Sequence, residues 1–305
     1  MGAGVARARE LARLITDELI KVLGLRPELG SRLLFGLLAG VPTGRFARLA
    51  AQFDQRVAAV GFREACRWAL PRFVREVQVF VQDSIPCEGP LLVAANHPGT
   101  VDSLAIAASL PRHDLRVVAS GLPFLRGLPA ARPHLICAGS DPHQRMGVVR
   151  ESVRHLRRGG ALLIFPSGNV DPDPAVLPGA EAALDTWSPS LGLMLRSVPE
   201  TRVLPAIISG VLAPGFLRNP LARRRATPRE RQKVAEFLQT VQQMVLPRTL
   251  ALRARLTFGR PLRLHELAAG NDAAQLTQAV VDAARRLLAD HLGAGAPPAR
   301  GEFAP

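Results

Sequence analysis

A histidine and an aspartate five positions apart follow a short apolar run in this 305-residue chain. Residues 91–95 are apolar, and the run ends in Asn96 and His97, with Asp102 beyond them. An imidazole backed by a carboxylate can take a proton from a hydroxyl group, because the carboxylate fixes the imidazole tautomer and stabilises its charged form. His97 and Asp102 are therefore a candidate general base and its orienting acid. Taken alone, they also fit a structural histidine and a carboxylate at a helix N-terminus.

A second block, rich in turn-forming residues, lies further along the chain. Residues 161–165 form another apolar run, which ends in Phe165-Pro166-Ser167-Gly168-Asn169. Proline and glycine here are typical of a tight turn after a strand. A third apolar run covers residues 202–208 and contains Pro205. The type and order of these three blocks indicate a site more specifically than any one of them.

This order of blocks resembles the glycerophospholipid acyltransferase superfamily. Members of that superfamily carry an Asn-His-x4-Asp block, then a Phe-Pro-Glu-Gly-Thr-Arg block, then a hydrophobic strand that bears proline. The resemblance covers roughly residues 75–262 and closes on Leu256-Thr257-Phe258-Gly259-Arg260-Pro261, which looks like the last strand of the family.

The resemblance implies direct acyl transfer. His97 would take the proton from an acceptor hydroxyl while that oxygen attacks the thioester of acyl-CoA or of an acyl carrier protein, and Asp102 would orient His97. No metal and no cofactor beyond this co-substrate is implied. Asn96 and the block Phe165-Pro166-Ser167-Gly168-Asn169 would form the substrate site, with Asn96 and Pro166 shaping the two turns. Arg145 would contact the acceptor headgroup, although a solvated helix face is the alternative for this arginine.

The chain departs from the family pattern at two places. Ser167 stands where the family has glutamate, and Asn169-Val170 stands where it has Thr-Arg. In the phosphate-using members that arginine is associated with the phosphate of the acceptor, so its absence argues against glycerol-3-phosphate and lysophosphatidic acid. The form Phe-Pro-x-Gly-x-Val, with Trp187-Ser188-Pro189-Ser190 after it, resembles the branch that includes ornithine-lipid and haemolysin-like acyltransferases.

Three other functions stay open at this point. Ser167 is a candidate nucleophile of a Ser-His-Asp lipid hydrolase, although the sequence lacks Gly-x-Ser-x-Gly and Pro-Ser-Gly fits a turn. The altered second block also fits a degenerate family member that binds lipid without turnover. The third alternative is a non-catalytic basic module that binds anionic membrane or nucleic acid.

The net charge of +14 favours anionic partners such as a phospholipid surface. The basic residues are spread along the chain and aromatic residues make up only 5%, which argues against nucleic acid. Cys66, Cys87 and Cys137 are widely spaced and indicate a reducing compartment. The sequence shows no signal-peptide pattern and no apolar run long enough to span a bilayer. We therefore expect a cytoplasmic protein that is peripheral on the inner face of the membrane.

Hydrophobic periodicity divides the chain into three parts. Apolar residues at helical spacing between Leu11 and Leu23, and again from Phe46 to Leu70, predict a helical N-terminal region over residues 1–70. A region of this kind precedes the catalytic core in the enzymes that this chain resembles, and the resemblance implies that it helps to contact the membrane. Residues 71–292 are expected to form the catalytic domain. Residues 293–305, rich in proline and glycine, are expected to be a disordered tail.

Within the catalytic part, apolar strands alternate with helical patterns. This alternation predicts an α/β fold with a mostly parallel or mixed central sheet of about seven strands, flanked by helices. The expected strands are residues 73–82, 91–95, 116–120, 134–138, 161–165, 202–208 and 253–259. The expected helices are residues 101–109, 144–158, 188–198, 227–246 and 272–292.

Overall fold

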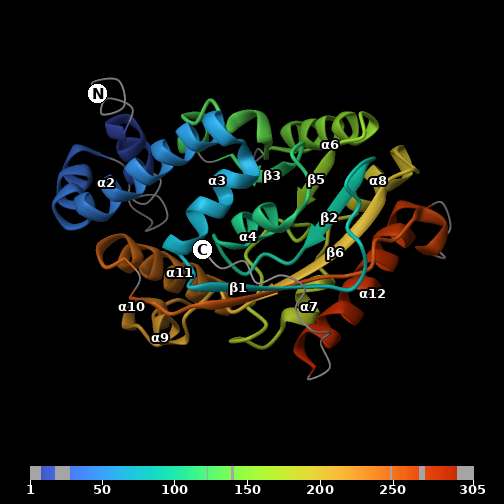
Figure 1. Cartoon of the computed structure of the whole chain (residues 1–305). Helices are drawn as coiled ribbons and strands as arrows, with labels where there is room; N and C mark the ends of the chain where they lie inside the picture. Colours follow the sequence, from blue (N-terminus) through green and yellow to red (C-terminus); the bar gives the residue numbers. More distant parts are fainter. Residues whose placement is uncertain are drawn as a thin grey trace.

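A seven-stranded mixed sheet forms the centre of the computed structural model (Figure 1). The structure describes residues 8–17, 28–121, 123–138, 141–247, 249–267 and 272–293, with the backbone alone for residues 29–39 and 142. The strands are β1 (Glu76–Val81), β2 (Leu91–Ala95), β3 (Arg116–Ser120), β4 (Leu135–Ala138), β5 (Ala161–Ile164), β6 (Arg202–Ser209) and β7 (Arg253–Phe258).

The helices flank this sheet. The longer ones are α2 (Leu29–Val60), α3 (Phe62–Ala69), α4 (Asp102–Ser109), α6 (Pro142–Arg157), α8 (Ser190–Ser197), α11 (Pro228–Val245) and α12 (Ala273–Leu292). The shorter ones are α5 (Pro123–Arg126), α7 (Ala180–Leu184), α9 (Pro214–Leu217) and α10 (Pro220–Arg223), with 3-10 turns at Leu70–Arg72, Arg132–His134 and Leu264–Leu267. The expected α/β fold is confirmed, with all seven strands and the five helices of the catalytic part.

The strand order is β1-β7-β6-β2-β5-β3-β4. The five strands from β6 to β4 run parallel, whereas β7 is antiparallel to β6, and β1 is parallel to β7. The carboxyl ends of β6, β2, β5, β3 and β4 therefore meet at one edge of the sheet. Loops that leave these strands are brought together there, although they lie far apart in the sequence.

Hydrophobic clusters cover both faces of the sheet. One cluster joins Leu91, Val93 and Ala95 of β2 to side chains of α2, α3, α4 and α11. The other joins Leu92 and Ala94 to side chains of α6, α8 and α12. Because both faces are covered, every residue of β2 is buried, which is why its sequence is a continuous apolar run and not an alternating one.

The N-terminal helices belong to the same core as the sheet. Residues 8–17 are helical, and the rest of the first expected helix, together with the tail beyond residue 293, lies outside the described residues. The second expected helix begins earlier than predicted, at Leu29, and it breaks at Gly61, whose φ of 87° is left-handed. The first strand was predicted to begin at Phe73, but it begins at Glu76. The N–H groups of Phe73 and Val74 donate to the Leu70 carbonyl and prolong the helical turn instead.

Within the part of the chain that the structure describes, none of the helices combines the length and the apolar character that crossing a bilayer requires.

Candidate active site

His97 and Asp102 form the centre of the site, at the carboxyl end of β2. His97 Nδ1 lies 2.7 Å from Asp102 Oδ2, and Asp102 opens α4. The Asp102 side chain is fully buried, whereas 31% of the His97 side chain is exposed. An ionised carboxylate can only accept hydrogen bonds, so the proton of neutral His97 resides on Nδ1. Nε2 is then the ring nitrogen with a free lone pair, which is the arrangement of a general base.

Two backbone N–H groups fix the carboxylate of Asp102 in place. Gly99 N–H donates to Oδ2 at 3.1 Å, and Ser103 N–H donates to Oδ1 at 2.6 Å. The loop between the base and the acid therefore wraps around the carboxylate. These donors hold the Asp102 carboxyl group in a fixed orientation inside the protein, where it has no contact with water.

Three carboxylates act on the pKa of His97. Burial of the imidazole lowers the pKa, but the charge and hydrogen bond of Asp102, with further contributions from Glu236 and Asp171, outweigh burial and raise the pKa to about 9. The imidazolium form is thus strongly stabilised, as is required of a base that holds a proton during a reaction.

The second sequence block packs against the first. The ring of Phe165, which follows β5, stacks on the His97 imidazole with 4.4 Å between the centroids and 22° between the planes. Gly168 N–H donates to the Phe165 carbonyl at 2.9 Å, which closes a tight turn, and the Gly168 φ of 63° is left-handed. Phe165 is thereby held as one wall of the site.

Ser167 and Asn169 are occupied within this turn. The Ser167 hydroxyl donates to the Asn169 carbonyl at 3.0 Å and accepts from Asn169 N–H at 3.3 Å, while Asn169 Nδ2 donates to the Ser167 carbonyl. The N–H of Gly168 is also used by the turn. The contacts of the block are those of a turn that supports Phe165.

Asn96 ties the end of β2 to β6. Its side chain is 4% exposed, its Nδ2 donates to the Ile208 carbonyl at 2.9 Å, and its Oδ1 accepts from Ile208 N–H at 2.8 Å. These two hydrogen bonds to the neighbouring strand β6 fix the direction in which the chain leaves the sheet. Asn96 therefore shapes the turn that presents His97.

Two aspartates that sequence patterns did not single out complete the loops. Asp171 Oδ2 accepts from His97 N–H at 2.9 Å, and Asp171 N–H donates to the His97 carbonyl at 2.7 Å. The fully buried Asp173 binds the loop after β6 through three N–H donors, and burial raises its pKa while these donors oppose the rise. In the sequence, Asp171-Pro172-Asp173 indicates only a turn. The two acidic residues so soon after Phe165-Pro166 are the one signal that could have drawn attention to it.

Ser188 and Arg145, which the sequence also singled out, lie in different parts of the structure. Ser188, from the Trp187-Ser188-Pro189-Ser190 block, donates its N–H to the Pro166 carbonyl at 3.0 Å and so supports the second turn. Arg145 lies near the start of α6 and is exposed. That helix follows β4, three strand spacings or about 14 Å from β2 on the same edge of the sheet. The structure thus brings Asn96, His97, Asp102 and the Phe165 block together, whereas Arg145 lies on the helix that follows the edge strand β4.

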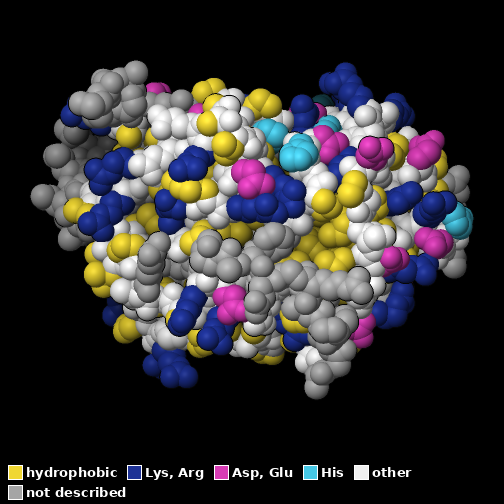
Figure 2. All heavy atoms as spheres, viewed as in Figure 1, with side chains coloured by type: hydrophobic (Ala, Val, Ile, Leu, Met, Phe, Trp, Pro, Cys, Tyr) yellow, Lys and Arg dark blue, Asp and Glu magenta, His cyan; other side chains and the backbone are white. Residues whose placement is uncertain are grey.

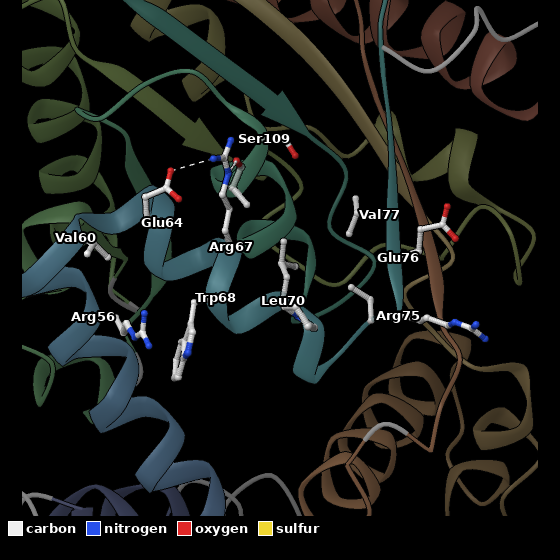
Figure 3. A pocket seen from close by; sticks show the side chains of 13 residues that line it. Arg56, Val60, Glu64, Arg67, Trp68, Leu70, Arg75, Glu76, Val77 and Ser109 are labelled. Carbon is white, nitrogen blue, oxygen red and sulfur yellow. Dashed lines mark hydrogen bonds and ion pairs between the residues drawn. The ribbon is translucent and has the colours of Figure 1, made fainter. Parts of the chain in front are cut away.

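A cavity of about 460 Å³ lies apart from these loops (Figure 3). It is lined by α2, α3, β1 and the end of α4, with Trp68 beside the Arg56 guanidinium and Arg67 bonded to Glu64. None of its lining residues belongs to the loops that hold His97 and Phe165.

Comparisons with known proteins point to one family. Residues 76–189 match the family model described as Acyltransferase, and this segment contains His97, Asp102 and the Phe165 block. No curated protein matches the chain. A crystal structure of the 1-acyl-sn-glycerophosphate (LPA) acyltransferase PlsC from Thermotoga maritima is similar, with a TM-score of 0.43 and 16% identity, over 95% of this chain and 98% of that chain. The family match is thus limited to residues 76–189, the segment that holds His97 and Asp102, and it agrees with the resemblance of the sequence blocks to the glycerophospholipid acyltransferase superfamily.

Proposed function

We propose that this protein transfers a fatty acyl group from acyl-CoA or acyl carrier protein to a hydroxyl group of a lipid-like acceptor. The observation that carries the proposal is the 2.7 Å pair of His97 and Asp102 within the acyltransferase segment. The partly exposed imidazole has one nitrogen bound to a buried acid and the other free to meet a substrate.

In the proposed reaction, His97 Nε2 takes the proton of the acceptor hydroxyl while the hydroxyl oxygen attacks the thioester carbonyl carbon. Asp102 keeps the proton on Nδ1 and stabilises the imidazolium that forms. The tetrahedral intermediate then collapses, the carbon–sulfur bond breaks, and the departing thiolate takes the proton from His97. The ester and the free thiol are the products, and His97 returns to its neutral state without a metal or a further cofactor.

The residues of the second block indicate whether the acceptor carries a phosphate. Asn169 and Val170 stand where phosphate-using relatives have Thr-Arg, so the turn offers no guanidinium to a phosphate at that place. Arg145, on the helix that follows β4, remains the candidate contact for the acceptor headgroup. We therefore propose a hydroxylated lipid without a terminal phosphate, taken from an anionic membrane surface to which the basic protein binds peripherally on the cytoplasmic side.

A hydrolase that uses Ser167 as its nucleophile is the weaker candidate. The hydroxyl of Ser167 both donates to and accepts from Asn169 within its own turn, whereas a nucleophile must bond to the base. A non-catalytic nucleic-acid module is also weaker. On the face drawn in Figure 2, the Lys and Arg side chains of the described residues are scattered among acidic ones and form no continuous basic stripe of the kind that binds a phosphate backbone.

The test is product formation. Purified protein and its His97→Ala variant would be incubated with acyl-CoA or acyl carrier protein and a panel of lysolipids and hydroxylated amino-lipids, and new esters would be read by mass spectrometry. We expect an ester that the variant does not form. Free fatty acid without an ester would support the hydrolase, and the same ester yield from both proteins would refute the role of His97.

A further inference from the structure

Four polar side chains lie along one face of α11, at helical spacing. They are Gln232, Glu236, Gln239 and Gln243. The three glutamines are 1%, 2% and 3% exposed, so each must find hydrogen-bond partners inside the protein. All four bind loops or strand starts that lie far away in the sequence.

The first two of these side chains hold the loop between His97 and Asp102. Gln232 Nε2 donates to the Pro98 carbonyl at 2.8 Å and to the Asp171 carbonyl at 2.7 Å. The Glu236 carboxylate accepts from both the N–H and the hydroxyl of Thr100. Pro98 and Thr100 both lie between His97 and Asp102. Helix α11 therefore binds the segment that sets the distance between the base and its acid.

The other two side chains bind elsewhere and provide an internal comparison. Gln239 bonds to the Ala213 N–H and the Val211 carbonyl in the loop after β6. Gln243 donates to the Phe73 carbonyl at 2.6 Å, before β1. Gln243 thus shares the helix face and the depth of burial of Gln232 but makes no contact with the His97 loop.

Glu236 is also one of three acids whose charge acts on His97. Asp102 bonds to the imidazole directly, and Asp171 bonds to the backbone of His97. Glu236 bonds to Thr100, three residues after His97. The charge of each of the three raises the pKa of His97. Burial raises the pKa of Glu236 itself, while the Thr100 hydroxyl lowers it.

We propose that Glu236 is a positioning residue, which holds Thr100 so that the loop from His97 to Asp102 keeps the geometry of a proton-accepting pair. The inference rests on the proposed acyl transfer and extends its machinery to α11, which lies outside the matched residues 76–189. Glu236 acts through Thr100 and needs no contact with substrate.

The kinetic test compares Glu236→Ala, Glu236→Gln and Gln243→Ala in the full chain, with melting temperatures measured beside kcat and KM. We expect Glu236→Ala to lower kcat about 10- to 100-fold, since small displacements of a catalytic group are enough for such losses. Glu236→Gln keeps an acceptor oxygen for Thr100 and should recover most of kcat. Gln243→Ala should keep kcat within about threefold even if its stability falls equally. Equal kcat losses in Glu236→Ala and Gln243→Ala would overturn the proposal.

A second readout does not depend on activity. The His97 imidazole would be titrated by NMR, with its signal assigned from the His97→Ala variant. Glu236→Gln, the milder change if the alanine variant folds poorly, should lower the His97 pKa because it removes a charge that raises it, and Gln243→Ala should leave the pKa unchanged. An unchanged pKa in Glu236→Gln would contradict the placement of the Glu236 carboxylate beside the His97 loop, on which the proposal rests. If that pKa shift occurs but the wild type forms no ester, the proposed function fails and the placement of Glu236 beside His97 stands.

Discussion

His97 and Asp171 are joined by two hydrogen bonds, one to the Asp171 carboxylate and one between their backbones. His97 N–H donates to Asp171 Oδ2 at 2.9 Å, and Asp171 N–H donates to the His97 carbonyl at 2.7 Å. The backbone of His97 is therefore fixed by the loop after β5, while its side chain is fixed by Asp102 at the start of α4. One histidine is held from two directions by acids of different loops, which is a form of preorganisation.

The two hydrogen bonds between Asp171 and the His97 backbone should matter for turnover. We expect Asp171→Ala to lower kcat about tenfold or more, because the His97 backbone N–H loses its acceptor and the two loops can separate. Asp171→Asn keeps an acceptor oxygen and should retain more of kcat than the alanine variant. Steady-state kinetics on both variants check this expectation, and wild-type kcat in Asp171→Ala would contradict it.

Asp102 should be needed for its charge as well as its position. Asn in its place keeps the size of the side chain but cannot stabilise the imidazolium, and its amide can present N–H to Nδ1 and favour the wrong tautomer. We expect Asp102→Asn to lower kcat by about 10²- to 10⁴-fold. Circular dichroism would serve as the folding control. A loss of less than threefold would show that the pair is structural.

Ser167 should be dispensable for the chemistry. Its hydroxyl is engaged with the Asn169 backbone, so Ser167→Ala removes turn contacts worth about 1 kcal/mol and no reacting group. We expect acyl transfer within about threefold of wild type, measured by ester formation. Complete loss of turnover in a folded Ser167→Ala protein would restore the hydrolase interpretation.

Asp173 should matter mainly for stability. Its fully buried carboxylate accepts from the N–H groups of Ala175, Gly210, Val211 and Leu212. Alanine would leave several buried donors without partners, and we expect the free energy of unfolding to fall by about 3 kcal/mol or more. Urea denaturation would measure this change.

The exposed Asp83 provides the control for Asp173. Asp83→Ala should change the free energy of unfolding by less than about 0.5 kcal/mol. Equal effects of the two substitutions would contradict the structural role given to Asp173.

The parts of the fold that the sequence predicts well are those with local signals. Runs such as residues 91–95 are buried on both faces and end in turn-forming residues. Strands and helices can therefore be predicted from hydrophobic periodicity and from the turn-forming residues at their ends. His97 and Asp102 are close in the chain, and their pairing is predictable from spacing. Gly61 shows the limit, because its break in the long helix depends on a left-handed φ that composition does not reveal.

The supporting residues of the site carry no such local signal. Asp171 lies 74 residues from His97, and Gln232 lies 134 residues from Pro98. In the sequence, a stripe of Gln and Glu along α11 looks like a solvated helix face, and only tertiary packing turns it inward. Contacts of this range depend on which loops the sheet order brings together, and periodicity contains no information about that order.

The most direct test of the proposed role of His97 is the pH dependence of acyl transfer. A base must be neutral to accept a proton, and the carboxylates around His97 raise its pKa to about 9. We therefore expect kcat/KM to rise about tenfold per pH unit from about pH 6 and to level off near pH 9. Glu236→Gln should move this limb to lower pH. A rate that is independent of pH across this range in the wild type, or that the His97→Ala variant reproduces, would contradict the assignment of His97 as the base.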